Sequence, residues 1–166
     1  SVRRALGDGS QFGVKLNYVE EPVILGTSGA LDNAREFFTK ETFVVVNGKI
    51  LTDIDLAKAF ETHRAIKALS TLILLPNEHR ELFSVVNTQD GLITGFGGMP
   101  SVGDKSPLMF TGIHIMEPEI FNYIPKGVFS HSTTDVYPQA IGNGERIAAL
   151  EERLELVARA GVEEDR

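Results

Sequence analysis

The sequence has no cysteine among its 166 residues. A chain without thiols cannot build a disulfide framework or a thiolate metal site, and it is compatible with a reducing compartment such as the cytoplasm. The four histidines, His63, His79, His114 and His131, are scattered without the spacing of a zinc site. A metal bound by this chain is therefore expected to be magnesium on oxygen ligands.

Long apolar runs are also missing, because the longest apolar stretches have the size of a strand and fall short of about 18 residues. The opening residues SVRRALGDGS lack the apolar segment of a signal peptide. We therefore expect a cytoplasmic protein with no membrane partner. The chain starts without methionine in what reads as the end of a helix, and we expect an amino-terminal portion to precede it.

Positive charge is in the minority, with 16 Lys and Arg against 23 Asp and Glu and a formal net charge of −7. Neutralising the phosphates of a duplex needs clustered Lys and Arg, so nucleic acid is not an expected partner, although a single nucleotide can bind locally. The length and the 42% of hydrophobic residues indicate one globular domain with a core.

Hydrophobic periodicity predicts an alternation of strands and helices. The alternating run VKLNYV indicates a strand over residues 14–19, and the compact runs FVVVN and STLILL indicate buried strands over 43–47 and 70–75. Apolar residues at helical spacing follow the first and second of these strands, with Thr27 or Ser28 and then Asp55 as helix caps. This order is typical of a layered α/β architecture with ligands at the carboxyl ends of the strands.

The second half of the sequence predicts a β-hairpin, another strand and three helices. FSVVNTQDGLITGF, over residues 83–96, is typical of a hairpin. LMFTGIHIM predicts a strand over 108–116 that is interrupted at Gly112, and Pro118 opens a short helix. Two further helices are expected over Asp135–Ile141 and Ile147–Ala160.

The first candidate site is the glycine loop LGTSGA, which contains Gly26, Thr27 and Gly29. Glycines at a loop-to-helix junction let the backbone approach a ligand, and free amides at a helix start can donate to a base, ribose or phosphate. The same pattern also fits an ordinary turn and helix cap. Both interpretations stay open from the residues alone.

The second candidate is Asn47-Gly48-Lys49, at the end of a predicted buried strand, where Lys49 can meet a phosphate as a point charge. The nearby Asp53 and Asp55 fit helix capping and the helix dipole better than metal binding.

The third candidate is Thr111-Gly112, because a glycine inside an apolar strand marks a bulge or a close approach of ligand. The contiguous residues FSHSTTD contain Ser, His and Asp but do not form a hydrolase triad, whose members converge from separate elements. Ser132 or Thr133 fits better as a cap of the next helix, with His131 as a secondary candidate for the site.

Taken in order, these segments resemble the sugar-phosphate nucleotidyltransferases, most closely their mannose-1-phosphate guanylyltransferase-like branch. The resemblance covers about residues 1–147 and is carried by LGTSGAL, FVVVNGKILTDIDL, STLILL, GLITGF, FTGIHIMEPEIFNYIP and FSHSTTDVYPQAI. It implies a Rossmann-like α/β/α fold with a mixed, mostly parallel sheet, incomplete at both ends. Residues 148–166 do not match, and we expect them to form a divergent helical tail.

The resemblance implies a reaction in which a nucleoside triphosphate and a sugar 1-phosphate give a nucleotide sugar and pyrophosphate, with Mg²⁺ as cofactor. It implies nucleotide contacts at Gly26, Thr27 and Gly29 and at Asn47-Gly48-Lys49. It also places Thr111 and Gly112 near the sugar. A homo-oligomer is left open, and the base and the sugar are not fixed.

Three departures from the family pattern bear on activity. Lys49 stands where most relatives have an aspartate that helps to hold magnesium, and a lysine has no acceptor for a metal. The Glu-Lys-Pro of many relatives is replaced by Gly97-Gly98-Met99-Pro100. The triphosphate loop and the second metal carboxylate are absent from this chain. We therefore expect the chain to be inactive alone, with a noncatalytic sugar-nucleotide-binding module or a structural domain without ligand as alternatives.

Overall fold

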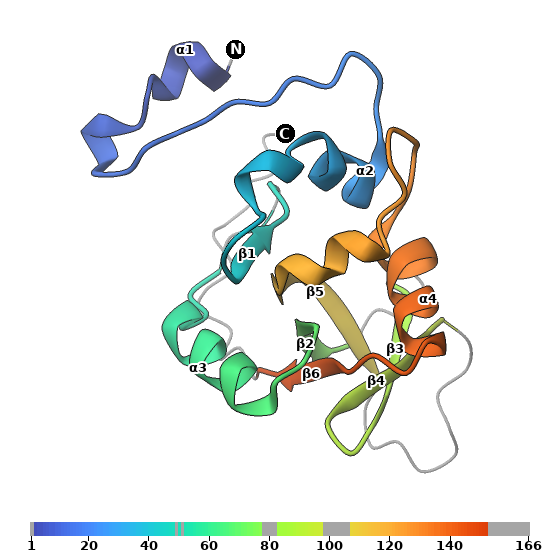
Figure 1. Ribbon diagram of the computed structural model, residues 1–166. Coiled ribbons are helices and arrows are strands. Elements are labelled where there is room, and N and C mark those ends of the chain that lie inside the picture. The colour runs from blue at the N-terminus through green and yellow to red at the C-terminus, as the bar shows by residue number, and fades with distance from the viewer. Residues whose placement is uncertain (1, 49, 51, 78–82, 98–106, 153–166) are drawn as a thin grey trace, which may run out of the picture.

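The computed structural model describes residues 2–48, 50, 52–77, 83–97 and 107–152 (Figure 1). In these ranges short helices surround six strands. The helices are α1 (Val2–Leu6), η1 (Ser10–Phe12), α2 (Gly26–Asn33), η2 (Arg35–Phe37), α3 (Leu56–Ile66), η3 (Pro118–Asn122), η4 (Ser132–Val136) and α4 (Tyr137–Gly142). The strands are β1 (Phe43–Val46), β2 (Ser70–Pro76), β3 (Val85–Gln89), β4 (Leu92–Phe96), β5 (Leu108–Met116) and β6 (Ile147–Glu151).

The sheet is mixed, with the strand order β1-β5-β2-β6-β4-β3. Only the β2–β6 pair is parallel among the described strands, so the prediction of a mostly parallel sheet is wrong. The sequence order β1-α3-β2 gives two strands that run in the same direction, as expected of a crossover through a helix. However, β5 lies between them and is antiparallel to both, and no local pattern could reveal this insertion.

Strand β5 is the hub of the sheet. One of its edges pairs with β2 along most of its length, while its other edge pairs first with β3 and then with β1. Because β3 also pairs with β4, and β4 with β6, the strands curl into a small, nearly closed sheet. The register of β2 against β5 shifts between Leu72 and Leu74, opposite Gly112, which has a φ of 86°. The bulge predicted at Gly112 is therefore confirmed.

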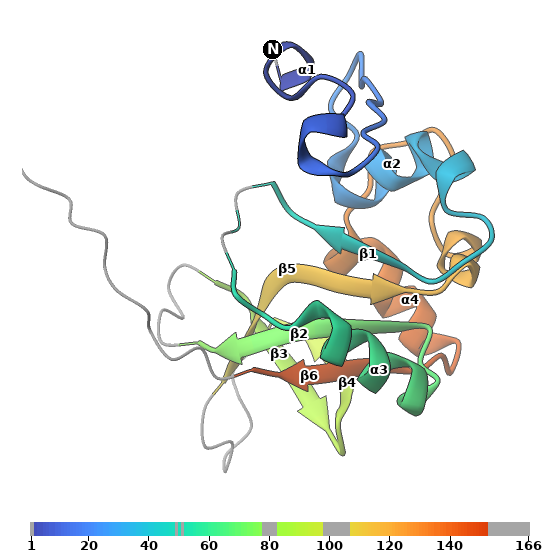
Figure 2. The same cartoon turned by 90° about the vertical axis from the view of Figure 1, so that its left-hand side faces the viewer.

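Helices lie on both faces of the sheet, so the α/β class is confirmed, whereas the small, nearly closed sheet differs from the open layered α/β/α sheet that was expected. On one face, Ala59 of α3 packs with Ile73, Ile113 and Ile115, and Figure 2 shows α3 in front of the strands. On the opposite face lies the larger core, which includes Tyr137 of α4 together with residues of η3 and α2.

Two predicted elements are wrong. Residues 14–19 form no strand, because no described segment pairs with them and most of their side chains face solvent. Residues Ile147–Glu151 are strand β6 and not the start of a helix, since burial of Ile147 and Ala148 beside β2 outweighs the helical propensity of this sequence. The rest of that predicted helix lies largely outside the described residues. The division into a domain over 1–147 and a tail over 148–166 stays a prediction.

Other local predictions are confirmed. Helix α3 begins after Asp55, whose carboxylate accepts a hydrogen bond from the Lys58 amide at 3.0 Å. The hairpin β3–β4 turns at Asp90 and Gly91, which have positive φ values of 52° and 77° as a tight two-residue turn requires. The strand over residues 108–116 and the short helix opened by Pro118 are both present.

Candidate functional site

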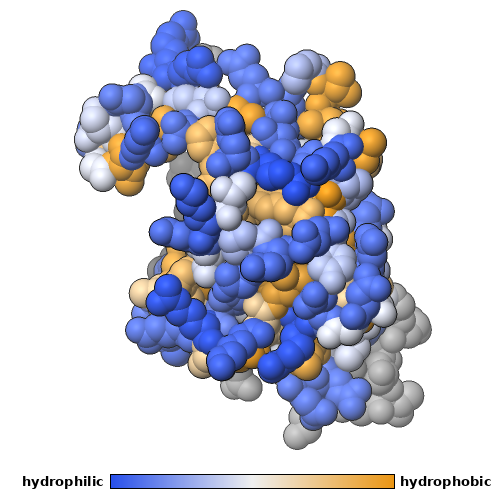
Figure 3. All heavy atoms as spheres, in the orientation of Figure 1, coloured by the Kyte–Doolittle hydropathy of each residue, from blue (hydrophilic) through white to orange (hydrophobic). Residues whose placement is uncertain are grey.

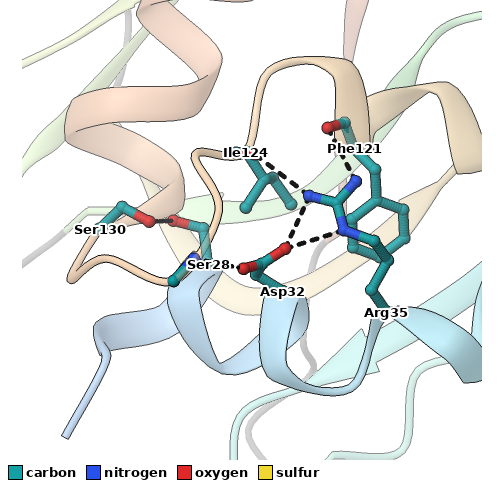
Figure 4. Close-up of polar contacts among 7 residues, drawn as sticks. Ser28, Asp32, Arg35, Phe121, Ile124 and Ser130 are labelled. Atoms are coloured by element: carbon teal, nitrogen blue, oxygen red, sulfur yellow. Dashed lines mark hydrogen bonds and ion pairs between the residues drawn. The ribbon is translucent and has the colours of Figure 1, made fainter.

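The glycine loop packs against the segment that follows η3. Helix α2 begins at Gly26, and the Ser28 and Gly29 amides donate to the Ser130 carbonyl at 3.1 and 3.3 Å. The Ser130 amide in turn donates to the Leu25 carbonyl at 2.9 Å. A buried hydrogen bond of 2.9 Å also joins the hydroxyls of Ser28 and Ser130 (Figure 4). Two of the amides expected to meet a ligand are thus bonded within the chain.

Both glycines of the loop leave room for this neighbouring backbone. A Cβ at Gly26 would lie 2.5 Å from the Ser130 carbonyl oxygen, and the φ of Gly26 is 76°. A Cβ at Gly29 would lie 2.8 Å from the Val128 carbonyl oxygen. Glycine is therefore needed here for the contact between two segments of the protein, whatever ligand approaches the loop.

Thr27 is the exposed part of the loop, and it faces His131. Its amide and its hydroxyl each lie 3.4 Å from His131 Nδ1, which makes both contacts weak. The Thr27 hydroxyl accepts a hydrogen bond from the Ser132 amide at 3.0 Å. Thr27 therefore caps the start of η4 and not its own helix, where no side-chain cap exists. The predicted capping by Ser132 or Thr133 is likewise wrong, since the Asp135 carboxylate accepts from the His131 amide at 2.7 Å.

The second group of predicted residues meets at the bulge of β5. The backbone amide of Asn47 donates to the Gly112 carbonyl at 3.0 Å, and a Cβ at Gly112 would lie 2.5 Å from Nδ2 of the Asn47 side chain. Gly48 is exposed with open space around it, and Lys49 lies outside the described residues. The Thr111 hydroxyl is already used, because it donates to the Ile73 carbonyl at 2.8 Å and accepts from the Ile113 amide at 3.2 Å.

A pocket of about 360 Å³ lies between the hairpin, β5 and η4. Its described lining has no charged side chain and consists of Phe83, Ser84, Val86, Phe96, Gly97, Phe110, Thr133 and Thr134. Phe110 precedes Gly112 by two residues and Thr133 follows Ser132, but the described lining includes none of the predicted site residues. No contact between described residues joins Thr27 directly to Asn47.

The sequence did not point to this pocket. Its three phenylalanines come from the start of the hairpin, from β4 and from β5, and only the folded sheet brings them together. A small apolar pocket of about 170 Å³ lies near the bulge. The predicted residue Thr111 and Ile50 are part of its lining, and the three phenylalanines are not.

The described residues do not fit a magnesium site. No group of three or more His, Asp or Glu side chains in the described part of the chain is arranged to hold a metal ion. Near Asn47, Asp53 is exposed and Asp55 is the cap of α3. No described helix has the length and apolar character that crossing a bilayer requires.

Two buried histidines serve the fold. His114 Nδ1 lies 2.5 Å from the Tyr137 hydroxyl, and burial lowers the pKa of His114 to about 3 and raises the pKa of Tyr137. His63 contacts the Thr71 hydroxyl at 2.8 Å and the Glu117 carboxylate at 3.0 Å. This hydroxyl–imidazole–carboxylate row is no reaction centre, because Thr71 is fully buried and no substrate can reach it.

The model of the nucleotidyl transferase family matches residues 1–155. The chain belongs to the nucleotidyl transferase family. A UTP–glucose-1-phosphate uridylyltransferase from Synechocystis is 37% identical over an alignment of 152 positions that covers 82% of this chain and 39% of that protein. An N-acetylmuramate alpha-1-phosphate uridylyltransferase from Neisseria meningitidis is 35% identical over an alignment of 135 positions that covers 76% of this chain and 54% of that protein.

Solved structures agree with this family. A Bacillus anthracis protein assigned as a glucose-1-phosphate thymidylyltransferase, in complex with sucrose, matches with a TM-score of 0.76 at 25% identity. The match covers 92% of this chain and 63% of that one. The predicted resemblance to the sugar-phosphate nucleotidyltransferases is thus confirmed at the level of the family, and the chain spans about half or less of the length of these two curated relatives.

Proposed function

We propose that this chain is the sugar-nucleotide-binding part of a sugar-1-phosphate nucleotidyltransferase. In the proposed reaction an oxygen of the sugar 1-phosphate attacks the α-phosphorus of a nucleoside triphosphate, and pyrophosphate leaves as the new P–O bond forms. Catalysis of this kind depends on alignment of the two substrates and on charge stabilisation. The observation that carries the proposal is the family match over residues 1–155, and an uncharged pocket between the hairpin, β5 and η4 supports it.

Under this proposal the two ends of the ligand occupy different groups of residues. The nucleotide lies along the loop of Gly26, Thr27 and Gly29, of which Thr27 is exposed, with Asn47, Gly48 and Lys49 beside its phosphates. The sugar lies at the bulge of Thr111 and Gly112, where Thr111 lines the pocket of about 170 Å³, and Phe110 of the same strand lines the pocket of about 360 Å³. Phenylalanine rings suit the apolar face of a sugar ring, and threonine hydroxyls suit its hydroxyl groups.

The base and the sugar remain predictions. The relatives' names include uridylyltransferases for glucose 1-phosphate and N-acetylmuramate 1-phosphate, and a mannose-1-phosphate guanylyltransferase from Mycobacterium tuberculosis that is 28% identical to this chain. The sequence resembles the mannose-1-phosphate guanylyltransferase-like branch most closely without fixing the base or the sugar, and uracil with glucose is the competing assignment. Cytoplasmic location, Mg²⁺ dependence and a homo-oligomer are likewise predictions.

A noncatalytic module that binds a nucleotide sugar is the second candidate. It is favoured by one observation of the sequence, Lys49 at the position where the family resemblance implies a magnesium-binding aspartate. A lysine has no acceptor for a metal, and Lys49 lies outside the described residues.

The test is to incubate the 166-residue chain with Mg²⁺, each nucleoside triphosphate and mannose or glucose 1-phosphate, and to follow pyrophosphate. Binding of UDP-glucose and GDP-mannose is measured in parallel by calorimetry. We expect saturable binding of a nucleotide sugar without turnover. Pyrophosphate release would refute the expectation that the chain is inactive alone, whereas no binding of any nucleotide sugar would refute the proposed function.

A matched pair of variants tests the pocket. Thr133→Val removes a hydroxyl from the pocket lining at nearly constant volume, and we expect weaker binding of the nucleotide sugar. Thr94→Val makes the same change at an exposed position of β4, outside that lining, and should leave binding unchanged. Equal affinities of the two variants would remove the pocket from the site.

A further inference from the structure

The carboxyl end of α2 carries a side-chain clasp, formed by Asp32 and Arg35 (Figure 4). Arg35 donates to Asp32 Oδ1 from Nε at 2.8 Å, and its Nη2 lies 2.7 Å from the same oxygen. The guanidinium also donates to the carbonyls of Phe121 and Ile124 at 3.1 and 3.2 Å, at the end of η3. The other Asp32 oxygen accepts from the Gly127 amide at 2.7 Å.

The clasp is mostly shielded from water. The side chains of Asp32 and Arg35 are 12% and 24% exposed, and the guanidinium lies 4.5 Å above the Phe121 ring. Burial opposes the charged form of Asp32, but the Gly127 amide and Arg35 outweigh it, so that the pKa of Asp32 is lowered. The carboxylate is therefore ionised at neutral pH, and charge-assisted hydrogen bonds hold the segment after η3 in place.

The clasp and the glycine loop hold the same segment at two points. Asp32 fixes Gly127, and three residues later the Ser130 carbonyl accepts the Ser28 and Gly29 amides. His131, which faces Thr27, comes next in the chain. Only three residues separate Gly127 from His131, so the clasp is linked to the residue that faces Thr27 by a backbone segment of at most about 14 Å.

We propose that Asp32 and Arg35 are positioning residues that set the distance between Thr27 and His131, and thereby the affinity of the loop for a nucleotide. Neither residue lines the described pockets, so the effect is exerted through the backbone of residues 127–131. The identity of the ligand in this inference rests on the proposed function, whereas the distance between Thr27 and His131 can be measured in the free chain.

The test compares Arg35→Lys with Arg64→Lys in the 166-residue chain. A lysine keeps the charge at position 35 but cannot reach the Asp32 carboxylate and two carbonyls at once. Arg64 is exposed and stacks on the Phe60 ring, so it provides the same change away from the clasp. We expect Arg35→Lys to weaken binding of the nucleotide sugar on the order of tenfold and Arg64→Lys to leave it unchanged.

Nuclear magnetic resonance separates positioning from simple loss of stability. Well below the unfolding temperature, Arg35→Lys should shift the Thr27 amide and the His131 ring resonances in the free chain, and Arg64→Lys should not. If Arg35→Lys does not fold, Asp32→Asn replaces it, since an amide keeps the shape but loses the charge and one acceptor.

The two proposals fail in different ways. If the wild-type chain binds no nucleotide sugar, the proposed function fails, and the resonances of Thr27 and His131 still test the clasp. If the wild type binds, and the clasp variants bind equally well with unshifted resonances, the positioning role is overturned and the proposed function stands.

Discussion

Substitution of Gly29 by alanine tests whether the glycine loop is shaped by the segment packed against it. Gly29 lies within α2, where alanine is intrinsically favoured over glycine by about 1 kcal/mol. A Cβ at this position, however, would lie 2.8 Å from Leu25 Cβ and 2.8 Å from the Val128 carbonyl oxygen. The first of these atoms belongs to the previous turn of the chain and the second to a backbone, so neither can give way without a shift of the loop.

Overpacking of this kind costs about 1–3 kcal/mol, which exceeds the gain in helix propensity. We therefore expect Gly29→Ala to lower the free energy of unfolding by about 1 kcal/mol. The matched control is Gly142→Ala at the end of α4, where nothing lies within 4 Å of the new Cβ. The control should be neutral or stabilising by less than about 1 kcal/mol.

Thermal unfolding followed by circular dichroism measures both variants, with an expected shift of about 2–4 °C per kcal/mol for a chain of this size. Gly29→Ala should unfold below the wild type and Gly142→Ala at or above it. Binding of the nucleotide sugar should also weaken in Gly29→Ala. A melting temperature of Gly29→Ala equal to that of Gly142→Ala would refute the reasoning, because the close contact with Val128 would then carry no cost.

Three further predictions concern the buried core and the bulge. Tyr137→Phe removes the hydroxyl that contacts His114 and Ser70 in the core and should lower the free energy of unfolding by about 1–3 kcal/mol, whereas Tyr123→Phe removes a surface hydrogen bond and should change it by less than about 0.5 kcal/mol in denaturant titrations. The folded state keeps His114 neutral, with a pKa of about 3 against 6.5 in the unfolded chain. The contribution of His114 to the free energy of unfolding is therefore fully present above pH 6.5 and falls by up to about 1.4 kcal/mol per pH unit towards pH 3. His114→Asn should flatten this pH dependence, and an unchanged slope would contradict the assignment. Gly112→Ala places a side chain at a φ of 86° against the Asn47 amide group and should cost about 2 kcal/mol or more, with loss of nucleotide-sugar binding in calorimetry, and retention of both stability and binding would contradict a tight bulge.

The strands with compact apolar runs could be predicted from the sequence because the hydrophobicity of their consecutive side chains favours burial. This holds for β2 and β5, whose predicted ranges differ from the observed ones by one residue at most. The order of strands could not be predicted, since the place of β5 between β1 and β2 depends on contacts between distant residues. The prediction of a helix over residues 147–151 was wrong for the same reason, because these residues pair with the distant strand β2 despite their helix-forming side chains.

The candidate site divides in a similar way. Asn47 and Gly112 lie together, as expected of a strand end and a bulge in one sheet. The contact of the glycine loop with residues 128–132 could not be foreseen, because it joins segments about 100 residues apart. The clasp left a local signal in the spacing of Asp32 and Arg35, which is that of a helical ion pair, but its carbonyl partners are visible only in the fold.

The central strand has a consequence for how the chain melts. Ile113 and Ile115 belong to the core under α3, whereas Leu108 and Met116 of the same strand belong to the core under α4. Neither core can lose this strand without exposing the other, so the two sides of the sheet cannot open separately. Heat or denaturant should therefore unfold both layers in a single cooperative transition, and a destabilising substitution in either layer should lower the stability of the whole chain.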